Sequence, residues 1–201
     1  MRQRILSQLA GTRPPQDPAL AALAALAPDV AGAFASLRLM PAAVLVPVVD
    51  RSPELSLLLT RRTEHLRDHA GQVSFPGGRV EPVDAGPLHT ALRESEEEVG
   101  VPGERVDVAG YLPARAVVTG FAVTPVVGFI EPGLAGIADP REVAEVFEVP
   151  LNWLLDRSNR IPATRAWGGI EISVCEYRYG AHRIWGATAQ IIDEFINIIS
   201  I

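Results

Sequence analysis

The chain has 201 residues, of which 48% are hydrophobic and 21% are charged, and its formal net charge is −6. This length and composition favour one compact domain, or one domain with an extra terminal element, and exclude a disordered, collagenous or coiled-coil protein. The acidic balance argues against a general nucleic-acid binder, which normally carries a basic surface, so no nucleic-acid partner is expected.

Cysteine content and hydropathy indicate where the protein works. The single cysteine, Cys175, cannot form a disulfide within the chain, which fits a reducing cytoplasm. No run reaches about 18 uncharged apolar residues, so neither a spanning helix nor a membrane partner is expected. The basic start at Met1–Leu6 lacks the apolar core of a signal peptide. The sequence therefore predicts a cytoplasmic protein.

The N-terminal segment is predicted to be a helical appendage over residues 1–38, followed by the main domain over residues 39–201. Alanine and leucine fill Ala19–Ala27, with the leucines at helical spacing, and Pro28 is expected to end this helix. Such a stripe indicates a packing surface, for which dimer contact is one use. A monomer and a homodimer both stay open.

The main domain begins with two strand-like runs, Ala43–Val49 and Leu55–Thr60, and the polar turn between them predicts a hairpin. A long loop follows to Gly78, and a helix is predicted from about Pro87 to Val99. Further strands are predicted at residues 106–111, 122–130, 146–150 and 171–179, and further helices at residues 151–156 and 187–199. Strands mixed with helices predict an α/β sandwich with a mixed β-sheet.

The predicted helix at residues 87–99 ends in a cluster of glutamates. At about 100° per residue, Glu94, Glu97 and Glu98 share one face, away from the apolar stripe. Like charges at these spacings cost about 0.2–0.5 kcal/mol per pair, and the negative end of the helix dipole adds about 0.3–1 kcal/mol per anion. A divalent cation would resolve this conflict, because carboxylate oxygens suit Mg²⁺ or Mn²⁺. The glutamates therefore predict a metal site.

Two adjacent glycines, Gly77 and Gly78, precede this helix. Glycine lets the backbone approach a metal or a phosphate closely, and a carbonyl there is free to act as a ligand. Several cationic or titratable side chains lie just upstream, at Arg61, Arg62, His65, Arg67 and His69. Guanidinium groups bind phosphate through paired hydrogen bonds. Cations and carboxylates are thus predicted to approach one cleft from two sides.

Together these residues resemble the signature of the Nudix hydrolase family, Gly-x5-Glu-x7-Arg-Glu-U-x-Glu-Glu-x-Gly-U, in which U is apolar. Its positions are filled here by Gly78, Arg93, Glu94, Glu97, Glu98, Gly100 and Val101. Two positions depart from it: Asp84 replaces Glu, with one extra residue before Arg93, and Ser95 occupies an apolar position. We expect Asp84 to stabilise the loop or the helix start rather than to bind metal.

A second pattern, from Leu58 to Gly78, resembles the motif of the coenzyme A pyrophosphatase branch of that family, Leu-Leu-Thr-x-Arg-(Ser/Ala)-x3-Arg-x3-Gly-x3-Phe-Pro-Gly-Gly. Every fixed position matches except Thr63, which stands in place of Ser or Ala. Residues 185–189 also resemble the C-terminal segment of this branch. The resemblance, which covers residues 42 to about 155 with specific motifs, implies a Nudix-type α/β/α sandwich.

The resemblance implies a hydrolase that uses Mg²⁺ or Mn²⁺ to cleave the diphosphate of coenzyme A or a derivative. The products would be 3′,5′-ADP and 4′-phosphopantetheine, or its acyl form. Glu94, Glu97, Glu98 and the Gly77 carbonyl would hold the metal, and Arg93 would orient the glutamates. Phosphate contacts are expected from Arg61, Arg62 and Arg67, and loop or substrate contacts from the two histidines.

Several roles stay open. The general base is either a helix glutamate or an acid from a later loop, with Glu142 as the candidate and Glu145 behind it. Leu112–Phe121 is expected to line the pantetheine side. Two other functions compete: hydrolysis of another nucleoside diphosphate, such as NADH or ADP-ribose, and non-catalytic nucleotide sensing by the same fold. The complete set of helix glutamates favours catalysis over sensing.

Overall fold

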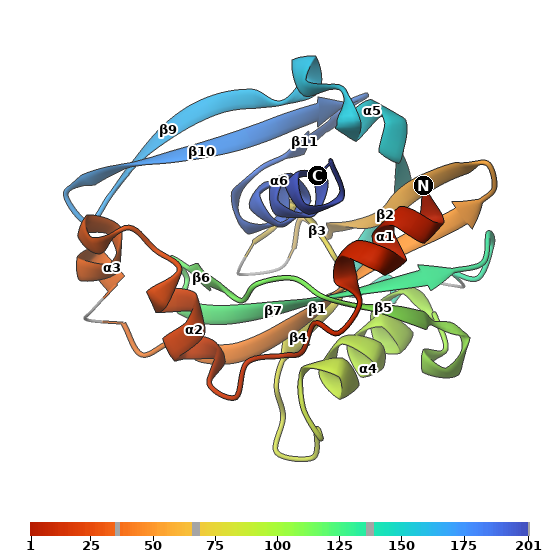
Figure 1. Cartoon of the computed structure of the whole chain (residues 1–201), viewed down its shortest axis with the longest axis horizontal. Coiled ribbons are helices and arrows are strands. Elements are labelled where there is room, and N and C mark those ends of the chain that lie inside the picture. Colours follow the sequence, from red (N-terminus) through yellow and green to blue (C-terminus); the bar gives the residue numbers. More distant parts are fainter. Residues whose placement is uncertain (35–36, 66–68, 136–138, 201) are drawn as a thin grey trace.

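A computed structural model describes residues 1–34, 37–65, 69–135 and 139–200. Its centre is a β-sheet in which neighbouring strands follow the order β3-β2-β1-β7-β5 (Figure 1). These strands are β1 (Met40–Arg51), β2 (Glu54–Arg62), β3 (Val73–Ser74), β5 (Asp107–Tyr111) and β7 (Phe121–Ile130). Three more strands each pair with one strand of this order: β4 (Gly77–Arg79) with β1, β6 (Arg115–Val117) with β7, and β8 (Val143–Pro150) with β2.

Parallel pairing of β1 with β7 makes this sheet mixed. Its register runs from Met40 opposite Phe121 to Val49 opposite Ile130. The remaining described pairs in the sheet are antiparallel. The predicted hairpin is confirmed, since β1 and β2 are antiparallel neighbours in the chain and in the sheet. The predicted mixed sheet is confirmed as well.

Helices cover both faces of the sheet (Figure 1). Packed against one face is α4 (Pro87–Val99), and packed against the other are α1 (Arg2–Leu9), α5 (Leu151–Leu155) and α6 (Gly186–Ser200). Successive residues of β1 point to opposite faces of the sheet: Leu45 packs on the face covered by α4, and Val46 on the face covered by α6. Burial on both faces explains why β1 is an almost continuous apolar run. No helix of the described ranges is long and apolar enough to cross a membrane.

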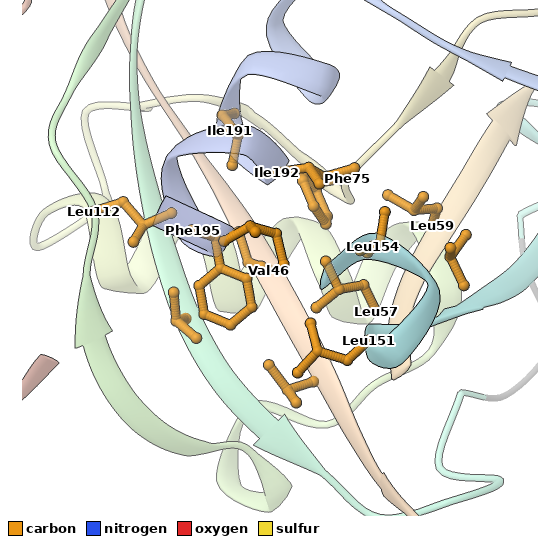
Figure 2. Close-up of a cluster of buried hydrophobic side chains, with 14 of the residues drawn as sticks. Val46, Leu57, Leu59, Phe75, Leu112, Leu151, Leu154, Ile191, Ile192 and Phe195 are labelled. Carbon is orange, nitrogen blue, oxygen red and sulfur yellow. The ribbon is translucent and has the colours of Figure 1, made fainter. Parts of the chain in front are cut away.

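The larger hydrophobic core lies between the sheet and α6 (Figure 2). Ile192 and Phe195 of α6 lie over Val46 and Leu57 of the sheet, and Leu154 of α5 belongs to the same cluster (Figure 2). All five side chains are at most 1% exposed. This core fixes α6, whose first turn contributes to the site described below.

A separate three-stranded sheet lies on the far side of α6 (Figure 1). Its strands are β9 (Ile161–Trp167), β10 (Ile170–Tyr179) and β11 (His182–Ile184). The predicted strand at residues 171–179 belongs here rather than to the central sheet. Strand β9 was not predicted from the sequence. Most of its residues are exposed, so the strand lacks the alternation of apolar and polar residues that indicates a half-buried strand. Strands β6 and β11 were not predicted either, because each has only 3 residues.

The N-terminal segment contains α1, α2 (Pro18–Ala24) and α3 (Pro28–Phe34). The prediction that Pro28 ends a helix over residues 19–27 is wrong, because Pro28 begins α3, where its missing N–H costs nothing. Both Ile5 and Leu9 of α1 are buried in the larger core. The division between an appendage at residues 1–38 and a domain at residues 39–201 stays a prediction.

Ile5→Ala should lower the free energy of unfolding by about 2–5 kcal/mol, because removing this fully buried side chain leaves a cavity in the core. Urea denaturation followed by circular dichroism measures the change. Leu20→Ala is the matched control, since Leu20 is 66% exposed, and should change stability by less than about 0.5 kcal/mol. An unchanged main transition in Ile5→Ala would mean that α1 unfolds separately from the core.

Candidate active site

A cavity of about 550 Å³ brings together residues that lie far apart in the sequence. Its polar lining includes Arg62 of β2 and Glu94 and Glu98 of α4, and Gly77 and Gly78 of β4 lie beside them. The structure therefore gathers both predicted glycines, two of the three predicted glutamates and one predicted arginine around one space.

The ends and the buried face of α4 explain how its glutamates are presented. Gly100 follows the helix at φ 67°, a left-handed conformation that suits glycine, and its N–H donates to the Glu96 carbonyl at 3.0 Å. Ala91, Ser95 and Val99 have no exposed surface. With this stripe turned to the sheet, the neighbouring acidic positions border the cavity.

The three glutamates differ in environment although they share a helix. The side chain of Glu94 is 17% exposed, that of Glu97 60% and that of Glu98 6%. All three also line a smaller hollow of about 300 Å³, together with Asp139 and Glu142. The helix thus presents one buried, one half-buried and one exposed carboxylate.

The Glu98 carboxylate is buried with little compensating charge. Nη1 of Arg62 lies 3.8 Å from its Oε1, and the Gly77 N–H donates to its Oε2 over a long 3.4 Å. Burial, reinforced by the nearby charges of Glu94 and Glu142 and partly offset by Arg62, raises the pKa of Glu98 to about 8. A cation in the cavity would favour the ionised form of this carboxylate.

The donor atoms around both hollows suit a hard divalent cation. They are carboxylate oxygens from Glu94, Glu97, Glu98 and Glu142, with the backbone of Gly77 beside them. Within residues 1–34, 37–65, 69–135 and 139–200, no three His, Cys, Asp or Glu side chains are grouped closely enough to form a ready-made metal site. The metal ligands stay a prediction, and the buried carboxyl group of Glu98, with the Arg62 guanidinium only as near as 3.8 Å, supports it.

Asp84 anchors the loop that precedes α4. Its carboxylate has no exposed surface and accepts hydrogen bonds from Nε and Nη2 of Arg93, at 3.1 and 3.0 Å. The Thr90 hydroxyl donates to it at 2.8 Å and the Glu81 N–H at 2.9 Å. These contacts, the Arg93 guanidinium foremost, hold the pKa of Asp84 well below its usual range. Asp84 stabilises the loop and the start of the helix, as expected.

Arg93 also contacts the acidic face of α4. Its Nη1 donates to Glu94 at 2.9 Å and to Glu97 at 3.3 Å, and its Nη2 also donates to the Arg79 carbonyl at 3.3 Å. Because Asp84 fixes one side of the guanidinium, the other side holds both glutamates in place. The geometry agrees with the predicted orienting role of Arg93.

The predicted phosphate-binding arginines are not all placed at the cavity. Arg62 lines it, and its Nε is buried without a hydrogen-bond partner among the described atoms. Arg61 is directed elsewhere and donates to Glu145 at 3.2 Å and to Glu64 at 3.3 Å. Successive strand residues point to opposite faces, which separates this pair. Arg67, the third predicted contact, lies outside the described residues.

The structure distinguishes the two candidate bases. Glu142 lines both the main cavity and the smaller hollow. Glu145 instead pairs with Arg61 and lies 3.4 Å from Nε2 of His182. The Glu142 carbonyl accepts the Thr63 N–H at 3.0 Å, which ties this segment to the end of β2. Position favours Glu142 over Glu145, and its role as base stays a prediction.

Part of the cavity lining is apolar. It includes Val117, Val118 and Phe121 of the β6–β7 hairpin, with Trp185 just before α6 and Ile191 within α6. The second half of residues 112–121 therefore lines the cavity, and its place on the pantetheine side stays a prediction. For the lining near α6, the only sequence signal is the resemblance at residues 185–189.

Contacts within the loop place the two histidines differently. His69 lines the cavity, and its Nδ1 lies 2.8 Å from Oε1 of Gln72, another lining residue. His65 lies near Thr63 instead, with its Nε2 3.5 Å from the hydroxyl. Gln72 and Arg79 line the cavity too, and sequence reasoning assigned neither of them a role.

Comparisons of the sequence and of the structure with known proteins all find Nudix proteins. A model of the NUDIX domain matches residues 39–166. An "Uncharacterized Nudix hydrolase NudL" from Cronobacter sakazakii is 51% identical over 159 residues, covering 79% of this chain and 82% of the relative. A protein of the same name from Photorhabdus laumondii is 44% identical, covering 80% and 85%. The crystal structure of a MutT/nudix family protein from Enterococcus faecalis, 19% identical, has a TM-score of 0.50 over 81% of this chain and 62% of that chain.

Asp84→Asn should lower the free energy of unfolding by about 3 kcal/mol at pH 7, because it leaves Arg93 without its buried partner. Since the native pKa of Asp84 is depressed, its contribution is complete above the unfolded value of about 4 and is lost as the pH falls below it. Urea denaturation at pH 7 and pH 3 should therefore show a difference from wild type that shrinks at the lower pH.

The control for this experiment is Glu171→Gln, which removes an exposed carboxylate with no ion pair to a described residue. It should unfold like the wild-type protein at both pH values. A destabilisation of Asp84→Asn that is equally large at pH 3 would contradict the ionic origin of the effect.

Proposed function

The chain belongs to the Nudix hydrolase family, and from this premise we propose that it cleaves the diphosphate of coenzyme A or a derivative. The products would be 3′,5′-ADP and 4′-phosphopantetheine, or its acyl form. The observation that carries the proposal is the cavity lining, which combines acids and the buried Nε of Arg62 with several apolar side chains. A nucleotide diphosphate with a long uncharged arm likewise combines charged and uncharged parts.

The polar part of the lining would hold the reacting diphosphate. We expect Mg²⁺ or Mn²⁺ there, held by Glu94, Glu97, Glu98 and the Gly77 carbonyl. Bound at these oxygens, the cation would neutralise charge on the diphosphate and acidify the attacking water. The residues fit such a cation, because the buried Glu98 carboxylate lacks a full counter-charge.

The protein's own groups would bind and orient the reactants. Arg62 has a buried Nε donor without an acceptor, which a phosphate oxygen would satisfy. Arg93, fixed by Asp84, keeps Glu94 and Glu97 in position. Glu142 borders both hollows and would accept the proton of the attacking water.

The apolar part of the lining would take the pantetheine arm. Val117 and Val118 of the β6–β7 hairpin belong to it, with Trp185 just before α6 and Ile191 within α6. Desolvation of such side chains favours binding of an uncharged chain. The motif from Leu58 to Gly78 supports the same substrate, since it matches the coenzyme A branch in all but Thr63. The lone cysteine, Cys175, supports a cytoplasmic location.

A substrate panel tests the proposal. Purified protein with Mg²⁺ or Mn²⁺ is offered coenzyme A, acyl-coenzyme A, NADH, ADP-ribose and a dinucleoside polyphosphate, and products are identified by mass spectrometry. We expect 3′,5′-ADP and 4′-phosphopantetheine, and no turnover after chelation of the metal. Faster cleavage of another compound would replace the substrate assignment. Binding of coenzyme A with metal but without product would indicate a nucleotide sensor.

Two variants of α4 test the metal assignment. Glu98→Gln should lower turnover by at least ~100-fold, because the transition state loses metal-ion stabilisation. Glu96→Gln is the matched control, since Glu96 is exposed on the same helix and lines neither hollow. Near-normal turnover in Glu98→Gln would contradict the metal assignment.

Gly78→Ala should impair catalysis without unfolding the protein. A Cβ at this position would clash with the carboxylate of Glu94, so the end of that flexible side chain must move. A shift of about 1 Å can cost roughly 100-fold in rate. The measurement is kcat/KM together with Tm. Gly32→Ala, whose Cβ would meet nothing within 4 Å, is the control, and unchanged activity in Gly78→Ala would contradict the placement of Glu94.

A further inference from the structure

Arg79, the last residue of β4, differs from most arginines of the chain in lacking an acidic partner. The described arginines that make no ion pair with a described carboxylate are Arg4, Arg13, Arg38 and Arg79. Of these, only Arg79 is part of the described cavity lining. It places an unneutralised cation at a site expected to bind a polyanion.

Phe121 positions this guanidinium. The Cζ atom of Arg79 lies 5.1 Å from the centre of the Phe121 ring, and both residues line the cavity. Stacking on an aromatic ring orders a guanidinium and leaves the N–H groups at its edge available to an anion. The sheet fixes the pair, since Ala42 of β1 lies opposite Arg79 on one side and opposite Val123 of β7 on the other.

Arg79 is set apart from the place expected for the cleaved diphosphate. Gly77, whose N–H donates to Glu98, is two residues earlier on the same strand, which is about 7 Å at the usual rise of a β-strand. Arg62 lies beside Glu98, with its Nη1 3.8 Å from Oε1. A diphosphate held there leaves the Arg79 guanidinium available to another anionic group of the same ligand.

We propose that Arg79, stacked on Phe121, binds a second phosphate of the substrate, distinct from the diphosphate that is cleaved. The inference rests on the proposed function, in which this group is the 3′-phosphate of coenzyme A. Neither NADH nor ADP-ribose carries such a group, so the contact would discriminate against both. Arg79 is thereby a specificity-determining residue, and it takes no part in the chemical step.

The test compares coenzyme A with dephospho-coenzyme A, which lacks the 3′-phosphate, as substrates in the presence of Mg²⁺. Wild-type protein should favour coenzyme A by about 10- to 100-fold in kcat/KM, mainly through KM, as expected for one charged hydrogen-bonded contact. In Arg79→Gln this ratio should fall to about one, and Arg79→Lys should restore part of it. Arg4→Gln, which removes an equal charge from an exposed position outside the cavity, should keep the wild-type ratio.

A binding measurement separates this inference from the proposed activity. Isothermal titration with adenosine 3′,5′-bisphosphate and with AMP should show tighter binding of the bisphosphate, and Arg79→Gln should abolish the difference. If the wild-type protein cleaves neither coenzyme, the proposed function fails, while this titration still supports or overturns the phosphate site. An unchanged ratio, or an equal loss for both ligands in Arg79→Gln, would overturn the inference.

Discussion

The buried pair of Asp84 and Arg93 is the interaction on which the site depends. A carboxylate without exposed surface stays ionised only when hydrogen bonds and an opposite charge replace water. Arg93 supplies both to Asp84, and its remaining N–H groups reach two glutamates of α4. One guanidinium thus joins the loop, the helix and the acidic face. Without it, the glutamates would repel one another at the negative end of the helix.

The net charge of −6 and the charge of the cavity are separate properties. Some acidic side chains, such as Glu131 and Glu148, pair with exposed arginines, where such pairs contribute little. Glu98 is different, because it is buried beside two other carboxylates and only one arginine. An acidic protein can therefore offer a phosphate-binding cleft once a cation binds its carboxylates.

Local chemistry made much of the fold predictable. Helix α4 spans the predicted residues because Pro87 suits a first turn and Gly100 adopts the left-handed conformation that ends it. The hairpin followed from two apolar runs around a polar turn. Pro28 was misjudged because proline both follows and begins helices, and the choice depends on how α3 packs.

The site was harder to predict, because its members are set by tertiary packing. The helix period places Glu97 and Glu98 on one face, and only the sheet decides which of them is buried. Similarly, Arg61 and Arg62 are adjacent and equal in charge, yet Arg61 pairs with Glu145 and of the two only Arg62 reaches the cavity. No motif indicated Arg79, since a lone arginine after two glycines has no pattern until Phe121 lies beneath it.

The parallel pairing of β1 with β7 has a consequence for biosynthesis. Strands that run in the same direction need a long crossover, here the whole stretch that contains α4, before they can meet. The cavity lining extends further, from Ala42 to Ile191. A ribosome must therefore release the chain as far as Ile191 before the cleft can close, so the nascent protein carries its acidic helix throughout the synthesis of residues 100–191 with no completed pocket around it.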